Sequence, residues 1–137
     1  MNSLKMSKMP VILALYTASL GSTFAQSYGV TNFAGANSVK DNASATENFF
    51  RRPGGVTSDA NGNLYLADGD DQRIRRITQG GIVTTIAGTG RGGFLGDGGQ
   101  AVDAQLRSPK NLALDRKRNL LYFSDYENFR VRQINLQ

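Results

Sequence analysis

The 137-residue chain contains no cysteine, no histidine and no tryptophan. The absence of cysteine excludes disulfides and thiolate chemistry. The absence of histidine excludes imidazole metal ligands, the commonest general base and Ser-His triads. Glu47 and Glu127 are the only glutamates, and neither occupies a position where we expect a catalytic or metal-binding carboxylate. We therefore expect no enzyme activity from this chain alone, and no cofactor.

A sustained helical period is also absent after residue 26, and one short candidate lies around residues 101–106. Instead, apolar and polar residues alternate in short runs bounded by Gly, Asn and Asp, as in 63–68 and 73–77. Such runs are typical of short strands joined by hairpins. Residues 59–62 predict a hairpin turn, because Asn and Gly accept the positive φ of tight turns. The predicted fold class is all-β.

Two segments of the chain repeat one another. Residues 53–77 read PGGVTSDANGNLYLADGDDQRIRRI, and residues 109–134 read PKNLALDRKRNLLYFSDYENFRVRQI. Pro53 corresponds to Pro109 at an offset of 56, and after one inserted residue Asp68 corresponds to Asp125 at an offset of 57. A period in this range predicts stacked supersecondary units.

These two copies resemble the NHL repeat, the unit of a family of six-bladed β-propellers. The resemblance is carried by the opening Pro, the Asn-Gly-Asn turn, the Leu-Tyr-Leu-Ala-Asp strand and the Arg-Ile/Val-Arg ending. The glycine-rich segment 81–109 resembles the connector of extracellular and bacterial members. The segment 121–125 also resembles the signature of the low-density-lipoprotein-receptor type of propeller, which implies the same architecture. Because this fold hosts binding proteins and enzymes alike, the resemblance implies a fold more than a function.

The resemblance implies four-stranded blades. In the first blade we predict strands at 55–58, 64–67, 73–78 and 82–87, and in the second at 111–114, 120–124 and 129–135. A fourth strand of the second blade does not follow, but Val30–Gly35 matches Val83–Gly88 at an offset of 53. Residues 26–137 are therefore predicted to form a partial NHL propeller of about two blades in permuted order.

Two blades do not close a ring, since about three repeats are needed to bury the blade faces. One interpretation is a segment of a longer propeller. The other is a homotrimer in which Val30–Gly35 of each copy completes the second blade of its neighbour, giving six blades.

The first 25 residues have the layout of a secretory signal. Lys5 and Lys8 precede an apolar run at 11–20, and Thr23-Phe-Ala25 offers small residues for cleavage before Gln26. A membrane anchor is the alternative, but a spanning helix needs about 20 apolar residues. We predict a secreted protein, extracellular or periplasmic, that is free of the membrane after cleavage.

The formal charge of +5 falls when Lys5 and Lys8 are removed, leaving 14 basic against 11 acidic residues. The remaining arginines belong to repeat strands or turns rather than to one basic face with stacking aromatics, which argues against nucleic acid. Asn42-Ala-Ser44 is an N-glycosylation sequon in a eukaryotic secreted chain.

The run Asp68-Gly-Asp-Asp71 invites a calcium site, since calcium takes about six to eight oxygen ligands. The alternative is structural, because Asp68 and Asp125 hold the same repeat position and a short carboxylate can accept backbone N–H groups. We favour bracing of the strand corners, and expect Arg73 and Arg130 to pair with these carboxylates.

Loops between blades form the binding faces of a propeller. The connector 88–99 and its counterpart 36–52 are therefore the predicted recognition surface, with these candidate contacts: Phe49, Phe50, Arg91, Phe94, Leu95 and Asp97. The predicted function is a binding module for protein or glycan. The alternatives are part of a propeller hydrolase or lyase whose catalytic residues lie in other blades, and a nucleic-acid-binding NHL domain.

Overall fold

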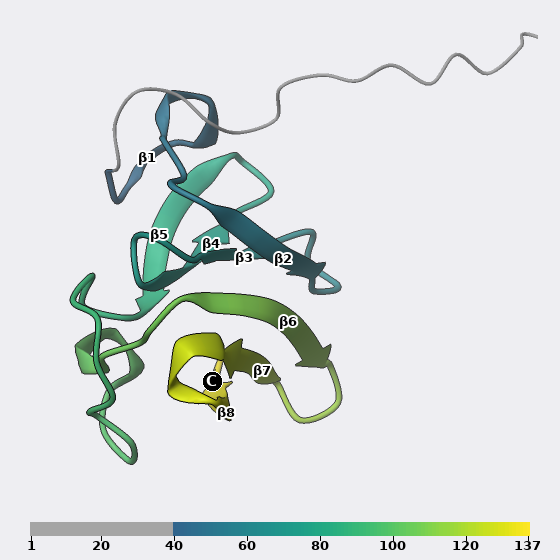
Figure 1. The fold of residues 1–137 in the computed structure, drawn as a ribbon. Coiled ribbons are helices and arrows are strands. Elements are labelled where there is room, and N and C mark those ends of the chain that lie inside the picture. The colour runs from purple at the N-terminus through teal and green to yellow at the C-terminus, as the bar shows by residue number, and fades with distance from the viewer. Residues whose placement is uncertain (1–39) are drawn as a thin grey trace, which may run out of the picture. The chain divides into compact units, whose positions relative to one another are not determined.

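The computed structural model describes residues 40–137, which form two antiparallel sheets (Figure 1). The first sheet has the order β1-β5-β4-β3-β2, and its strands β2 to β5 form blade 1. The second sheet has the order β6-β7-β8 and forms blade 2. The strand bounds are β1 Ala43–Ser44, β2 Pro53–Ser58, β3 Leu64–Asp68, β4 Arg73–Ile77, β5 Ile82–Ala87, β6 Pro109–Asp115, β7 Leu120–Asp125 and β8 Arg130–Asn135.

The predicted all-β class is confirmed, and each predicted strand of the two blades is present within two residues of its expected ends. The turn after β2 forms as expected, because Asp59 Oδ1 accepts the N–H groups of Asn61 and Asn63, both at 2.9 Å, and Gly62 has a φ of 78°. The short strand β1, which pairs with Ile82 and Val83 of β5, was not predicted. Residues 1–25 and Val30–Gly35 lie outside the described residues.

The helices of the described part of the chain are single 3₁₀ turns. They are η1 Ala45–Glu47, η2 Ala101–Asp103 and η3 Tyr126–Asn128. The turn η2 falls where the sequence suggested a short helix and is briefer than predicted. Within residues 40–137, no helix has the length and apolar character needed to cross a membrane.

The core lies between the two blades. One face of blade 1 includes Tyr65, Ala67 and Ile74. It packs against the face of blade 2 that includes Leu121, Phe123 and Ile134. Leu106 of the connector is also fully buried in this cluster. Successive side chains of a strand point to opposite faces of the sheet. The apolar residues at every second position therefore lie on one face, and this face packs against the other blade.

The innermost strands of the two blades approach closely at Gly54 and Gly55. A Cβ at Gly55 would lie 2.9 Å from the backbone nitrogen of Leu112, and one at Gly54 would lie 2.9 Å from the carbonyl oxygen of Lys110. No side chain fits in this space, so glycine is required where β2 meets β6.

We expect Ile74→Ala to lower the free energy of unfolding by about 2–5 kcal/mol, because Ile74 is fully buried between the blades and truncation leaves a cavity. Val102→Ala serves as the control, since Val102 is 45% exposed on η2. Urea unfolding followed by circular dichroism measures both. Equal losses in the two variants would show that the blades do not pack as described.

Candidate functional site

The best-formed polar site of blade 2 is the corner where β7 ends. Asp125 is fully buried, and its Oδ1 accepts the backbone N–H of Arg107 at 2.6 Å. Its Oδ2 accepts from Asn128 Nδ2 at 2.8 Å and from Arg132 Nη1 at 3.2 Å. Arg132 Nη2 also lies 2.7 Å from Oδ1 of Asp97 in the connector. This network joins the connector, β7 and β8 at one point.

Blade 1 has a related corner built around Asp68 and Arg75. Asp68 is fully buried, and its Oδ1 accepts the backbone N–H of Arg51 at 2.9 Å. Arg75 is 2% exposed and donates to Asp41 Oδ1 at 2.8 Å and to Asp71 Oδ2 at 2.7 Å. Asp41 lies in the segment that leads into blade 1, as Asp97 lies in the connector that leads into blade 2.

The predicted pairing of Arg73 with a corner aspartate is present at Asp71 rather than at Asp68, and Asp125 is bound by Arg132 instead of Arg130. Arg73 Nη1 binds Asp71 Oδ2 at 2.7 Å, and its Nη2 donates to the Thr89 carbonyl at 2.9 Å. Arg130 lies over the ring of Phe94, at 3.7 Å from the centroid. The arginines that reach Asp68 and Asp125 are Arg75 and Arg132, two residues further along each strand.

Burial raises the pKa of the Asp68 carboxyl, and the nearby Asp71 carboxylate adds to the rise, although the N–H of Arg51 and the Arg75 guanidinium oppose it. Asp59 shows the opposite balance. Burial raises its pKa somewhat, but hydrogen bonds from Asn63, Tyr65 and Asn61 outweigh it, so the pKa of Asp59 is lowered. The two carboxylates should therefore affect stability in opposite directions as pH changes.

The carboxylates of the Asp68–Asp71 run are directed to guanidinium groups. Asp71 binds Arg73 and Arg75, and Asp70 Oδ1 lies 2.9 Å from Arg52 Nη1. Among residues 40–137, no group of three or more carboxylates is arranged to hold a metal ion. The geometry thus gives the calcium alternative no support.

The predicted recognition residues divide between two places. Phe50 packs against the cluster of Ala45, Ile77 and Val83 in blade 1, while the neighbouring Phe49 is 45% exposed. The remaining candidates lie in the connector beside blade 2: Arg91, Phe94, Leu95 and Asp97. Leu95 is 65% exposed and Phe94 40% exposed, so this loop presents apolar side chains to solvent.

The sequence did not indicate which residues of blade 2 lie beside Phe94 and Leu95. The turn of η3 is joined to the connector through Asn128, whose Nδ2 donates to the Gly93 carbonyl at 2.6 Å, and through Arg130 over Phe94. This turn exposes two aromatic rings. We call the resulting surface the aromatic corner; it comprises Phe94, Leu95, Lys110, Tyr126, Phe129 and Arg130.

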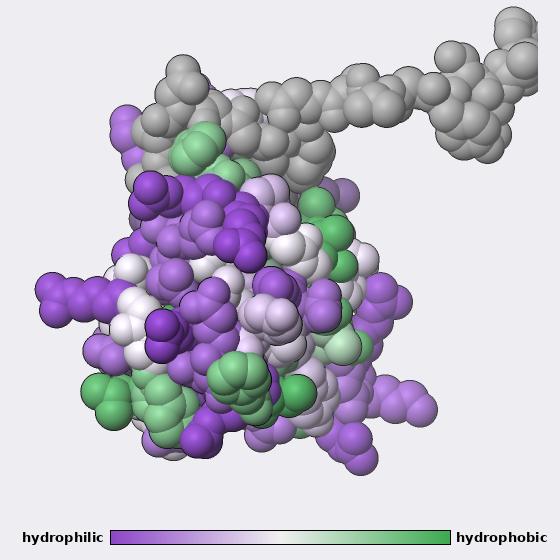
Figure 2. Space-filling model, viewed as in Figure 1, coloured by the Kyte–Doolittle hydropathy of each residue, from purple (hydrophilic) through white to green (hydrophobic). Residues whose placement is uncertain are grey.

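Phe129 is the most exposed member of the aromatic corner, at 95%, and its φ of 54° lies in the left-handed region that an aromatic residue rarely adopts. Lys110 Nζ lies 3.2 Å from the centroid of the half-exposed Tyr126 ring. Figure 2 shows apolar residues gathered over the part of the molecule where blade 2 and the connector lie. The two repeats differ at these positions, since Phe129 corresponds to Gln72 and Tyr126 to Gly69. This difference in sequence could have indicated the exposed rings.

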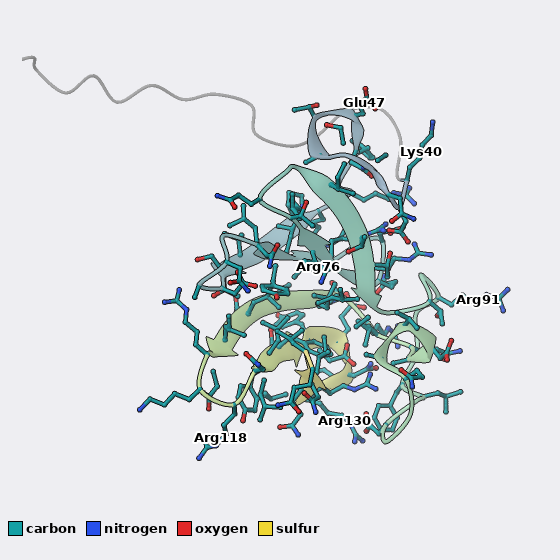
Figure 3. The ribbon with its side chains drawn as sticks, turned by 180° about the vertical axis from the view of Figure 1, so that it is seen from behind. Lys40, Glu47, Arg76, Arg91, Arg118 and Arg130 are labelled. Atoms are coloured by element: carbon teal, nitrogen blue, oxygen red, sulfur yellow. The ribbon has the colours of Figure 1, made fainter. Side chains whose placement is uncertain are left out.

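The basic side chains of residues 40–137 do not gather on one face. Lys40, Arg91, Arg118 and Arg130 extend from different sides of the molecule (Figure 3). The Arg116 guanidinium, in the turn after β6, donates to the Ser58 carbonyl at 3.0 Å.

These features define a β-propeller blade pair with braced corners. Comparison with known families finds that the model of the NHL repeat matches residues 50–77. The chain thus contains an NHL repeat, in a fold that is similar to part of known β-propellers.

Human Teneurin-4 is 37% identical over 87 residues, which is 54% of this chain and 3% of Teneurin-4. A structural genomics protein of unknown function from Bacteroides thetaiotaomicron has a TM-score of 0.66 and 24% identity, covering 74% of this chain and 26% of that chain. An auxiliary nutrient binding protein from Bacteroides ovatus has a TM-score of 0.58 and 23% identity, covering 74% and 27%. This chain thus spans a small part of each protein it resembles.

Replacing Asp125 with Ala should lower the free energy of unfolding by about 3–5 kcal/mol, because it leaves the largely covered Arg132 and the Arg107 N–H without their carboxylate. Asp97→Ala is the matched control. Its carboxylate binds the same arginine but is 62% exposed, so the loss should be about 1 kcal/mol or less. Chemical denaturation compares the two, and a similar loss in both would contradict the bracing role of Asp125.

The pH dependence of stability should distinguish Asp68 from Asp59. A raised folded pKa means that Asp68 contributes stability below its unfolded pKa of about 3.8, and that this contribution is lost as pH rises through the folded value. The free energy of unfolding of the wild type minus that of Asp68→Asn should therefore fall as the pH rises above about 3.8.

Asp59→Asn is the control of opposite sign. The lowered pKa of Asp59 gives a contribution that is present above about pH 3.8 and is lost as pH falls through the folded value. Urea titrations at a series of pH values measure both differences. Slopes of the same sign for the two variants would show that the two carboxylates do not differ as described.

Proposed function

We propose that this chain is a non-catalytic binding module that acts outside the cytoplasm and contacts a protein partner through the aromatic corner. The observation that carries the proposal is the exposure of Phe129, at 95%, and of Leu95, at 65%, in segments joined by short polar contacts. Monomeric proteins rarely leave large apolar side chains grouped at the surface without a binding role.

The chemistry of the aromatic corner suits a partner that offers apolar side chains next to carboxylates. Lys110 and Arg130 lie over the rings of Tyr126 and Phe94, so positive charge and aromatic surface are presented together. Aromatic residues and arginine are enriched among the residues that dominate protein interfaces. A glycan partner is the alternative, since exposed rings are compatible with it as well.

The comparisons support the location and the type of function. Similarity to part of Teneurin-4, and a fold shared with an auxiliary nutrient binding protein, favour a binding role at an extracellular or periplasmic site. The buried carboxylates Asp68 and Asp125 are directed to backbone N–H groups and arginines. Their engagement supports a structural rather than a catalytic role for them.

The test applies labelled full-length chain to an array of purified extracellular protein domains and to an array of printed glycans. The double variant Leu95→Ser/Phe129→Asn should bind at least about tenfold more weakly than the wild type to the protein spots, since exposed apolar anchors dominate such interfaces. Asparagine is chosen at 129 because it tolerates positive φ.

Ile82→Thr is the control, since Ile82 is 40% exposed on blade 1, outside the aromatic corner, and threonine suits a strand. This variant should bind as the wild type does. Binding to glycan spots alone would favour the glycan alternative. Equal binding by the double variant and the wild type, or no binding to either array, would contradict the proposal.

A further inference from the structure

A small polar pocket of about 240 Å³ lies between the β2–β3 turn of blade 1 and the β6–β7 turn of blade 2. Its lining includes Asp59, Asn63 and Tyr65 from blade 1, and Arg116 and Asn119 from blade 2. Asn119 precedes β7 and Tyr126 follows it, so this pocket and the aromatic corner lie at opposite ends of that strand. The pocket is therefore a separate site from the aromatic corner.

Arg76 of β4 also lines this pocket. Tyr65 and Arg76 are paired across β3 and β4, so their side chains lie on the same face of blade 1, the one that meets blade 2 (Figure 3). Among residues 40–137, Arg76 Nε is buried without a hydrogen-bond partner, and no ion pair reaches its guanidinium. Because β4 is paired on both sides, with β3 and with β5, this position lies inside the sheet. A partly buried guanidinium without a partner favours the binding of an anion.

The one carboxylate that lines the pocket, Asp59, is engaged by its own turn. It accepts the backbone N–H groups of Asn61 and Asn63, the Asn63 Nδ2 group at 2.7 Å and the Tyr65 hydroxyl at 3.1 Å. The lowered pKa of Asp59 keeps this carboxyl ionised, yet no ion pair joins it to Arg76. Two guanidinium groups, of Arg76 and Arg116, thus stand against one engaged carboxylate, and the pocket carries a net positive charge.

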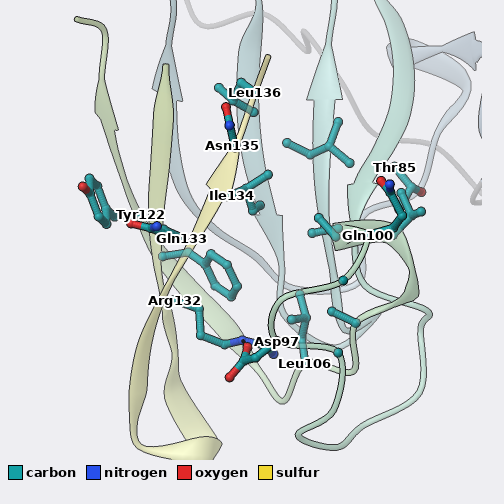
Figure 4. A pocket seen from close by; sticks show the side chains of 18 of the residues that line it. Thr85, Asp97, Gln100, Leu106, Tyr122, Arg132, Gln133, Ile134, Asn135 and Leu136 are labelled. Atoms are coloured by element: carbon teal, nitrogen blue, oxygen red, sulfur yellow. Dashed lines mark hydrogen bonds and ion pairs between the residues drawn. The ribbon is translucent and has the colours of Figure 1, made fainter. Parts of the chain in front are cut away.

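The two arginines of the pocket are departures from the repeat. Arg76 corresponds to the uncharged Gln133 of β8, which Figure 4 shows. Arg116 corresponds to Ala60 in the turn of blade 1. The arginines that brace the blade corners, in contrast, occupy the same position in both repeats. Each blade has therefore placed at their junction a positive charge that the bracing of its corner does not use.

The lining indicates the chemistry of a ligand. A guanidinium presents N–H donors in a planar fork that fits a carboxylate, and the ionised Asp59 nearby disfavours a doubly charged group such as a phosphate monoester. The side-chain amides of Asn63 and Asn119 can both donate and accept hydrogen bonds, as the hydroxyl groups of a sugar do. A volume of about 240 Å³ is roughly eight times the ~30 Å³ of a water molecule in the liquid, which suits one sugar unit.

We propose that this pocket binds a sugar unit that carries a carboxylate. The carboxylate lies against Arg76 and Arg116, and the hydroxyl groups of the sugar lie against the amides of Asn63 and Asn119. Lys117, which is exposed in the same turn, adds positive charge beside the pocket. This charge favours the approach of a polysaccharide rich in such acidic units.

The test titrates isotope-labelled full-length chain with sodium glucuronate and follows it by NMR. The side-chain amide resonances of Asn63 and Asn119 and the Nε–H resonance of Arg76 should shift saturably. Glucose lacks the carboxylate and sodium acetate lacks the sugar. Each should therefore bind at least about tenfold more weakly than glucuronate, as expected for the loss of one charge-assisted hydrogen bond or of several neutral ones.

Arg76→Gln should weaken glucuronate binding at least about tenfold, because it removes the charged donors. Glutamine suits the strand, since blade 2 has it at the corresponding position. Arg118→Gln is the matched control. It removes the same charge from a 75% exposed side chain of the same turn that does not line the pocket, and it should bind as the wild type does. The double variant Leu95→Ser/Phe129→Asn should also retain glucuronate binding, which separates this site from the aromatic corner.

Three results would overturn the proposal: no saturable shift in the wild type, equal affinity for glucuronate and for glucose or acetate, or equal weakening in Arg76→Gln and Arg118→Gln. Circular dichroism checks that each variant is folded. Arg116→Gln provides a second variant in an exposed turn, where the substitution does not disturb a strand. It should also weaken glucuronate binding, and an affinity equal to that of the wild type would count against the site even if Arg76→Gln did not fold.

Discussion

The buried aspartate at each blade corner is the interaction on which the rest of the structure depends. Asp68 and Asp125 are inaccessible to solvent, and each accepts the N–H of a residue just before its blade begins. This single hydrogen bond fixes where the connecting loop meets the blade. In the strand that follows each of these aspartates, an arginine, Arg75 or Arg132, then binds an aspartate of the same loop, Asp41 or Asp97. Loop, strand corner and sheet are thereby tied together in both repeats, although the two loops differ in length and sequence.

The strands of both blades could be predicted because their alternation and turn residues are local properties of the sequence. The Asn-Gly turn and the positions of β3 and β7 follow directly from that pattern. The burial of Arg75 and the partial burial of Arg132 could not be recognised, because a charged residue in an alternating strand predicts solvent exposure. Their burial depends on Asp41 and Asp97, which come from loops with no fixed spacing to the strands. The expected partner of Arg73 is Asp71 in the turn, and Asp68 is approached by Arg75 instead.

Only some residues of the aromatic corner could be predicted from local sequence patterns. Phe94 and Leu95 were recognised as apolar residues in a polar loop, but their neighbours across space were not. Tyr126 and Phe129 belong to a repeat turn, which in isolation suggests a purely structural role. Comparing the two repeats shows instead that blade 2 has aromatic rings where blade 1 has Gly69 and Gln72. In blade 1, Gln72 Oε1 accepts the N–H of Ser108 and so links the two blades. At the corresponding position blade 2 has the exposed ring of Phe129, which makes no such link.

A second difference between the repeats changes how each corner is stabilised. Asn128 of blade 2 donates a hydrogen bond to Asp125, whereas the corresponding residue of blade 1, Asp71, has no proton to donate when ionised. Asp68 Oδ2 consequently lacks a hydrogen bond and lies 3.9 Å from Arg75 Nε. Asp71 compensates by binding both Arg73 and Arg75. The blade 1 corner therefore relies on the balance of buried charges, while the blade 2 corner relies more on directional hydrogen bonds.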